Sequence, residues 1–264
     1  MLTNVSHLKG LAIHASDGEI GHVDEFYFDD ESWAIRYLVV NTGGWLSGRL
    51  VLISPAFVRG TDLQARQLHL SLTRHQIENS PGINTHKPVS RQHEAEYMNY
   101  YGSLYYWGGP YLWGAGPMPS DMLQPPSPID IQAGAVKRDS FDSHLRSTSA
   151  VTGYHLAAED ASIGHIKDFI ISPETWRIHY LEIDTRNLMP GKTVLLAPEW
   201  VQSVNWSDSE VHARLSSEMI KSAPEYHDSV PITREYENEI HRHYGTVPYW
   251  HHETEHVWKM KAGK

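Results

Sequence analysis

The chain contains one sequence module twice. Residues 10–107 align with residues 153–250 at a constant offset of 143 positions and without a gap, and about 30 of the 98 aligned pairs are identical. Self-similarity at a fixed spacing is typical of chains built from repeated structural units. Each copy has about 100 residues, which is a common domain size. We therefore expect two copies of one fold, each with its own core.

Within each copy the apolar segments are short, rich in β-branched and aromatic residues, and separated by turns. This pattern is typical of a small antiparallel barrel or sandwich. In the first copy we expect strands at 11–15, 19–28, 34–41, 49–54 and 68–72, with counterparts 143 residues later. Both alternating sets of side chains are apolar between Ala34 and Val40, so we expect this strand to be covered on both faces.

Three features inside the strand patterns carry specific expectations. Asp17-Gly18 is a typical hairpin turn, because glycine accepts the positive φ of a type I′ loop. Gly21 and Gly164 stand within strands, where glycine marks a bulge or the close approach of another backbone. Trp33 and Trp176 precede the strand covered on both faces, and we expect them to fill the core, because large aromatic side chains dominate core burial.

Two helices are predicted after each set of strands. Thr73 and Ser216 are suitable N-caps for a short helix, which must end before Pro81 or Pro224. A longer helix is expected to begin after Ser90 or Thr233. Gly102 and Gly245 then provide its C-terminal stop.

The repeats define the domain boundaries. We assign residues 1–107 and 150–250 to two β modules with C-terminal helices, and residues 251–264 to a charged, histidine-rich tail. Residues 108–149 contain Gly-Gly-Pro, Gly-Pro-Met-Pro and Pro-Pro-Ser-Pro with little periodicity, which predicts a largely irregular linker. Its start, Tyr111-Leu112-Trp113, could anchor on the first module.

Composition narrows the classes of function. The formal net charge of −10 disfavours binding to nucleic acid or anionic membranes, which require a positive surface. No stretch approaches the roughly 18 apolar residues of a membrane-spanning helix, and the first ten residues do not resemble a secretory signal. There is no cysteine, which excludes disulfides and thiolate chemistry. We expect a soluble, cytoplasmic chain whose partner is another protein or a second copy of itself, and a small-molecule substrate is not favoured.

Several retained motifs resemble those of tandem PRC-barrel proteins. They are Asp17-Gly-Glu-Ile-Gly-His-Val23, Trp33-Ala-Ile-Arg-Tyr-Leu-Val-Val40 and Gly48-Arg-Leu-Val-Leu-Ile-Ser-Pro55, together with their counterparts in the second copy. The resemblance implies small, mainly antiparallel β-barrels, similar to the cytoplasmic domain of the H subunit of the bacterial photosynthetic reaction centre. It also implies a protein-docking role. A photosynthetic electron-transport role is a less favoured implication, because the expected N-terminal membrane helix is missing from the sequence.

The tail contains a formal His-Glu-x-x-His motif. On a helix, His252 and His256 would share one face and could bind zinc, with Glu253 as a general base. Polar residues between them and the short remaining chain favour a solvated tail instead. His241 and His243 are further weak candidates for metal binding. The eighteen histidines leave open a pH- or metal-responsive binding protein as the alternative function.

The last candidates lie on the longer helices and just after them. Arg91 and Glu94, like Arg234 and Glu237, have the spacing of an intrahelical ion pair. Arg91 and Arg234 could instead anchor the helix to the barrel or bind a partner's carboxylate. The possible partner-binding residues are Arg91, Arg234, Tyr106, Trp107, Tyr249 and Trp250. No catalytic triad, phosphate loop or cofactor motif is present, so we expect no enzyme, no cofactor and a noncatalytic scaffold or adaptor.

Overall fold

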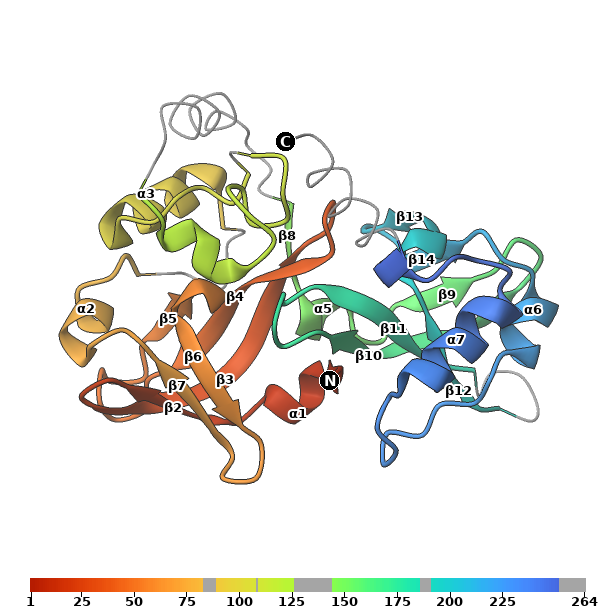
Figure 1. The fold of residues 1–264 in the computed structure, drawn as a ribbon, viewed down its shortest axis with the longest axis horizontal. Helices are drawn as coiled ribbons and strands as arrows, with labels where there is room; N and C mark the ends of the chain where they lie inside the picture. Colours follow the sequence, from red (N-terminus) through yellow and green to blue (C-terminus); the bar gives the residue numbers. More distant parts are fainter. Residues whose placement is uncertain (83–88, 108, 126–143, 186–190, 252–264) are drawn as a thin grey trace, which may run out of the picture. The chain divides into compact units, whose positions relative to one another are not determined.

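The computed structural model describes residues 1–82, 89–107, 109–125, 144–185 and 191–251. The chain divides into two compact units. The first unit consists of Asn4–Val151 and Ile171–His179, and the second consists of Met1–Thr3, Thr152–Ile170 and Tyr180–Lys264. Figure 1 colours the chain along its sequence and labels the elements of both units.

The first unit contains a sheet in the order β5-β4-β3-β2-β7-β6. Strand β8 (Leu145–Ser147) pairs with β3 outside this path. The strands of the path are β2 (Ala12–Ala15), β3 (Gly18–Asp29), β4 (Ala34–Asn41), β5 (Leu50–Ile53), β6 (Val58–Asp62) and β7 (Gln67–Leu70).

The second unit repeats this order as β12-β11-β10-β9-β14-β13, and β1 (Thr3–Asn4) pairs with β10 outside the path. The strands of the path are β9 (His155–Ala157), β10 (Ser162–Ile171), β11 (Ile178–Asp184), β12 (Thr193–Leu196), β13 (Val201–Asn205) and β14 (Glu210–Ala213). The mainly β class and its repetition are therefore confirmed.

The sheets are mainly antiparallel, as predicted, but each also contains one parallel strand pair. Strand β2 pairs with β7 in parallel, and β9 pairs with β14 in parallel. A parallel pair requires a long crossover, and here the intervening strands β3 to β6 provide it in the first unit. Alternation of side chains is the same for both strand directions, so the sequence pattern does not reveal this difference.

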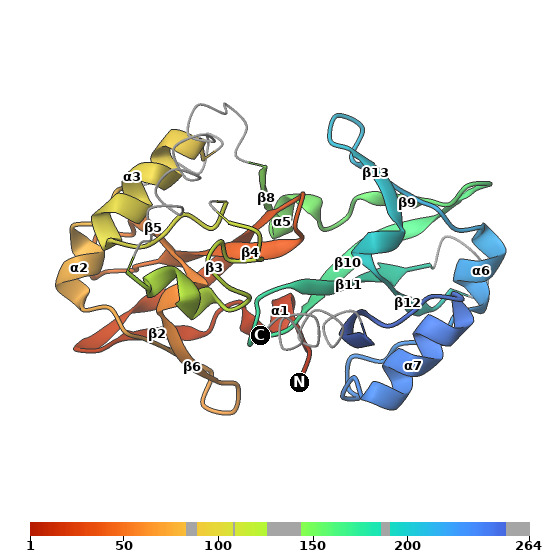
Figure 2. The same ribbon diagram turned by 45° about the horizontal axis from the view of Figure 1, so that its top comes forward.

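The helices begin at the predicted caps. Helix α2 (Arg74–Glu78) has Thr73 as its N-cap, with a complete capping box to Gln76. Helix α3 (Arg91–Tyr101) follows Ser90 and ends at Gly102, whose φ is 64°. Both helices lie beside β5 in Figures 1 and 2. In the second unit, α6 (Ser217–Ser222) and α7 (Arg234–His243) follow Ser216 and Thr233 in the same way.

The remaining helical segments are short. They are α1 (Val5–Leu8), α5 (Thr148–Val151) and the 3₁₀ turns η1 (Pro55–Phe57), η2 (Pro119–Leu123) and η3 (Pro198–Trp200). In the described part of the chain, no helix has the length and apolar character needed to cross a membrane.

The retained glycines are required by close backbone packing. A Cβ atom at Gly21 would lie 2.0 Å from the carbonyl oxygen of Asn41, and one at Gly164 would lie 1.9 Å from that of Asp184. The predicted close approach is thus confirmed in both units. The hairpin turn is displaced by one residue from the prediction, because Ala15 pairs with Gly18 and leaves Ser16 and Asp17 as the loop.

The strand predicted to be covered on both faces is confirmed, since every residue of β4 before Asn41 is buried. Trp176 is buried with 2% exposure, as expected for a core residue, whereas Trp33 is only half-buried. The linker is more ordered than its composition predicts. It contains η2 and β8, and Trp113 and Met122 are fully buried.

Candidate functional site: a repeated polar cluster with two different covers

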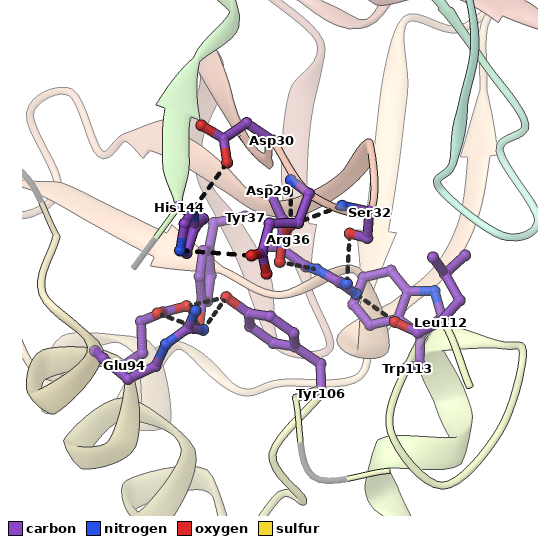
Figure 3. Close-up of polar contacts among 12 residues, drawn as sticks. Asp29, Asp30, Ser32, Arg36, Tyr37, Glu94, Tyr106, Leu112, Trp113 and His144 are labelled. Carbon is purple, nitrogen blue, oxygen red and sulfur yellow. Dashed lines mark hydrogen bonds and ion pairs between the residues drawn. The ribbon is translucent and has the colours of Figure 1, made fainter. Parts of the chain in front are cut away.

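A buried polar cluster joins α3 to the first sheet. Tyr37 on β4 and Tyr106 after α3 both donate hydrogen bonds to Glu94 Oε1, at 3.0 and 2.6 Å. Arg91 Nη1 donates to Tyr106 Oη at 2.7 Å and lies 3.1 Å from Glu94 Oε2. Figure 3 shows Tyr37 and Tyr106 converging on Glu94. We call these four residues the first cluster.

The second unit contains the same cluster at positions 143 residues later. Tyr180 and Tyr249 donate to Glu237 Oε1 at 3.2 and 3.1 Å. Arg234 Nη1 donates to Tyr249 Oη at 2.9 Å and lies 2.9 Å from Glu237 Oε2. These four residues form the second cluster. The ion pairs predicted from the i, i+3 spacing are therefore present in both repeats, and they also attach each helix to its sheet.

Each arginine also lies over a tryptophan ring. The guanidinium carbon of Arg91 is 4.4 Å from the centre of the Trp107 ring, and that of Arg234 is 4.2 Å from the centre of the Trp250 ring. Contacts of this kind attract a cation to the face of an aromatic ring. The arrangement of arginine, glutamate, tyrosine and tryptophan is therefore the same in the two units.

In the first unit a second arginine and the linker cover the cluster. The guanidinium carbon of Arg36 lies 4.0 Å from the Tyr106 ring centre and 4.8 Å from that of Trp113. Arg36 Nη1 donates to the carbonyl of Leu112 at 2.7 Å, and its Nε lies 3.7 Å from Asp29 Oδ2. Figure 3 shows the side chain of Arg36, a residue of β4, directed toward the linker residues Leu112 and Trp113. The second repeat has His179 at this position.

Further contacts hold the linker in place. The Nε1 of Trp113 donates to the carbonyl of Thr175 at 2.8 Å, and the backbone N–H of Leu104 donates to the carbonyl of Met122 at 2.8 Å. Leu104 is 8% exposed, whereas its counterpart Val247 is 56% exposed. The arginines differ in the same sense, with the side chain of Arg91 5% exposed and that of Arg234 56% exposed.

Burial changes the acidity of the glutamates. Complete burial raises the pKa of Glu94 to about 7, although Arg91 and the tyrosine hydroxyls oppose this shift. Burial also raises the pKa of Glu237, against the influence of Arg234 and Tyr249. Beside the second cluster, His241 Nε2 lies 3.1 Å from the hydroxyl of Tyr180, and burial lowers the pKa of this histidine to about 4.

The structure distributes the predicted partner-binding residues unequally. Arg91 and Tyr106 are buried and hydrogen-bonded to each other, so little of either is available to a partner. Arg234 is exposed, and Trp107, Tyr249 and Trp250 are half-buried. Sequence reasoning missed Arg36, because the second repeat has a histidine there and no retained pair marks the position.

The candidate metal ligands do not come together in the described residues. His241 is buried and bonded to Tyr180 and Thr246, and His243 Nε2 contacts the carbonyl of Met219 at 2.8 Å. His252 and His256 lie outside the described residues. Within the described ranges, no group of three or more histidine, aspartate or glutamate side chains has an arrangement that could hold a metal ion.

Comparison with known proteins adds one assignment. No curated protein matches the chain. The family model of the PRC-barrel domain matches residues 4–73, which span the first sheet from α1 to β7 and end at the N-cap of α2. The three residues that complete the first cluster with Tyr37, all on or after α3, lie beyond this match. Residues 4–73 therefore form a PRC-barrel domain.

Proposed function

We propose that the chain is a noncatalytic docking protein with two PRC-barrel modules, and that it binds a protein partner beside the second cluster. The docking surface consists of Arg234, Val247, Tyr249 and Trp250. The arginine, glutamate and tyrosines of each cluster bond to one another, which favours a structural role for the clusters over a catalytic one.

The proposal of a second PRC-barrel module, in residues 153–250, rests on two observations. The aligned repeats share about 30 identical pairs. Both sheets also have the same strand order, and in each the first strand pairs in parallel with the last, β2 with β7 and β9 with β14. Two modules with the same core are expected to differ chiefly in what their surfaces contact.

One observation carries the docking proposal: equivalent surfaces are covered in the first repeat and exposed in the second. Leu104, whose N–H donates to the linker carbonyl of Met122, is buried, while Val247 is exposed. The arginine exposed in the second repeat already has a fixed position, because Glu237, Tyr249 and the Trp250 ring hold it. A preorganised arginine beside aromatic side chains is typical of residues that dominate protein interfaces.

The linker indicates the chemistry of the partner. It covers the first repeat with two fully buried large side chains, Trp113 and Met122, and directs the carbonyl of Leu112 at Arg36. We therefore infer that the partner presents a protein segment with large apolar side chains. Because Arg234 is the exposed cation of this surface, we expect oxygen acceptors of the partner to bind it. The net charge of −10 makes nucleic acid a poor alternative.

The chain offers a matched pair of variants to test this. Val247 and Val230 are 56% and 57% exposed in the same unit, but only Val247 belongs to the docking surface. Wild type, Val247→Asp and Val230→Asp would serve as baits in cells of the source organism. A partner should be captured by wild type and Val230→Asp and lost with Val247→Asp, and titration of the purified partner should reproduce this order. Equal binding of all three proteins would reject the docking surface.

A further inference from the structure

Two hairpin ends in the first unit form a reciprocal backbone joint. The N–H of Ile35 donates to the carbonyl of Trp176 at 2.8 Å, and the N–H of Ile178 donates to that of Trp33 at 2.7 Å. Ala34 and Arg177 form the antiparallel bridge between these bonds. At the repeat offset of 143, Ala34 faces its own counterpart Arg177, Ile35 bonds to the counterpart of Trp33, and Trp33 bonds to the counterpart of Ile35. The two halves of the joint are therefore copies of each other.

Both halves have the same unusual loop. Trp33 and Trp176 have φ angles of 53° and 58°, a left-handed conformation that is disfavoured for a bulky side chain. The N–H of Trp33 donates to the carbonyl of Asp29, and that of Trp176 to the carbonyl of Ser172. Each tryptophan then places its own carbonyl in the joint. Backbone strain retained at equivalent positions indicates a conformation kept for a contact.

The second half of the joint is also held by side chains. Trp176 is 2% exposed, and its ring centre lies 6.3 Å from that of Phe26. Trp113 donates to the carbonyl of Thr175. The first unit thus binds the segment Ile171–His179 as a compact part of itself, although this segment lies between strands of the second unit in the sequence.

We propose that this joint also forms between two copies of the chain, so that the hairpin of residues 172–178 from one chain pairs with residues 29–35 of another. An interface made of two copies of one surface is self-complementary, and exchange of identical elements is a common route to dimers. The bonds are the same within and between chains. The two arrangements differ in the local concentration of segment 172–178 around segment 29–35. For segments linked in one chain, this effective concentration is on the order of 1 mM.

The chain provides a site where the exchanged part can move away. The first unit ends its main segment at Val151, and the second unit begins its main segment at Thr152. Gly153 follows with a φ of 94° and is exposed. Because glycine reaches many backbone conformations without a steric penalty, this point can redirect the chain. We expect exchange after refolding at high protein concentration and little of it in dilute solution.

Cysteine substitution tests the exchange, since the natural sequence has no cysteine. Ala34 and Arg177 face each other as a pair without mutual hydrogen bonds, for which Cα atoms are typically about 4.5 Å apart and within reach of a disulfide. Chains with Ala34→Cys and differently tagged chains with Arg177→Cys would be refolded together at about 1 mM and oxidised. We expect a disulfide between positions 34 and 177 of different chains, found by peptide mapping. Refolding at about 1 µM should reduce its yield at least tenfold.

A control measures disulfides that form by random collision. Chains with Gln202→Cys, at an exposed position outside the joint, would be refolded with chains that carry Ala34→Cys. Light scattering of the refolded wild type should show a two-chain species under the same concentrated conditions. Circular dichroism checks that each variant folds. The exchange is refuted if the 34–177 link is no more abundant than the 34–202 link, if links between identical positions predominate, or if the wild type refolds only to a monomer.

Discussion

The two polar clusters contain the same residues with nearly the same bonds, but different surroundings. In the first unit Arg36 and the linker cover the cluster, and the side chain of Arg91 is 5% exposed. In the second unit Arg234 makes the equivalent bonds at 56% exposure. Because a charge buried away from water depends more strongly on its partner, the first cluster should contribute more to the free energy of unfolding than the second, despite the similar geometry. The bonds common to both clusters are those that the fold requires, whereas the exposure found only in the second cluster leaves a surface for a partner.

The largest expected effect comes from removing the cover. Trp113→Ala should destabilise the first unit by about 3–5 kcal/mol, because this fully buried ring leaves a large cavity. Hydrogen exchange should also increase around Leu104, making the first cluster resemble the second. Tyr111→Ala is the matched control in the same segment, because Tyr111 is 39% exposed. Equal losses of stability in urea for the two variants would mean that the linker does not cover the cluster in solution.

A smaller effect is expected from Arg91→Ala, at about 3 kcal/mol. Removing one member of a buried ion pair costs about 3–5 kcal/mol, and here the tyrosine hydroxyls still donate to Glu94, which favours the lower end. Arg234→Ala should cost less than about 1 kcal/mol, as is usual for exposed pairs. Urea unfolding measures both. A similar cost for the two variants would contradict the role assigned to burial.

Tyr106→Phe should come next, at about 2 kcal/mol, because its hydroxyl donates to one charged group and accepts from another. The equivalent change Tyr249→Phe removes the same two bonds at a half-buried site, where water can replace them. We expect its cost in urea unfolding to be less than half as large. If Tyr249→Phe is the more costly variant, the second cluster is less accessible to water than its exposure indicates.

Much of the fold could be predicted from the sequence, because its signals are local. The caps Thr73 and Ser90, the close approach at Gly21 and the covered strand β4 each depend on a few neighbouring residues. The parallel strand pairs depend on contacts between distant segments, and β6 is too polar and exposed to stand out.

Only part of each cluster could be predicted from the sequence, because some of its contacts join distant segments. The spacing of Arg91 and Glu94 predicts their ion pair, and the repeat alignment marks Tyr37 and Tyr106 as retained. Nothing local connects Tyr37 to a glutamate 57 residues away. The aromatic run at Tyr111–Trp113 suggests that the linker anchors on the first module, but its contact with Arg36 is not predictable, because the segment lies outside the aligned repeats. Exposure, which distinguishes the two clusters, is therefore a property of tertiary contacts alone.

Glu94 in the first cluster and His241 beside the second should change the stability of their units in opposite directions as the pH falls. The pKa of Glu94 is about 7 in the folded chain and near 4.5 when unfolded, so the folded state binds the additional proton between these values. Its contribution to stability should therefore increase as the pH falls from 7 to 4.5. Glu94→Gln should flatten this slope for the first unit, measured as urea midpoints from pH 4.5 to 8. An unchanged slope would show that Glu94 remains ionised throughout, held by Arg91.

His241, which lies beside the second cluster and replaces Met98 of the first repeat, should respond in the opposite direction to Glu94. Burial lowers the pKa of His241 from 6.5 to about 4, so between these values the unfolded chain binds more protons. Its stabilising contribution is complete above pH 6.5 and is lost as the pH falls toward 4. His241→Met introduces the residue of the first repeat and should remove this acid sensitivity from the second unit, with little change at pH 8. Persistence of the full acid sensitivity in His241→Met would place its origin in other groups, such as the exposed histidines.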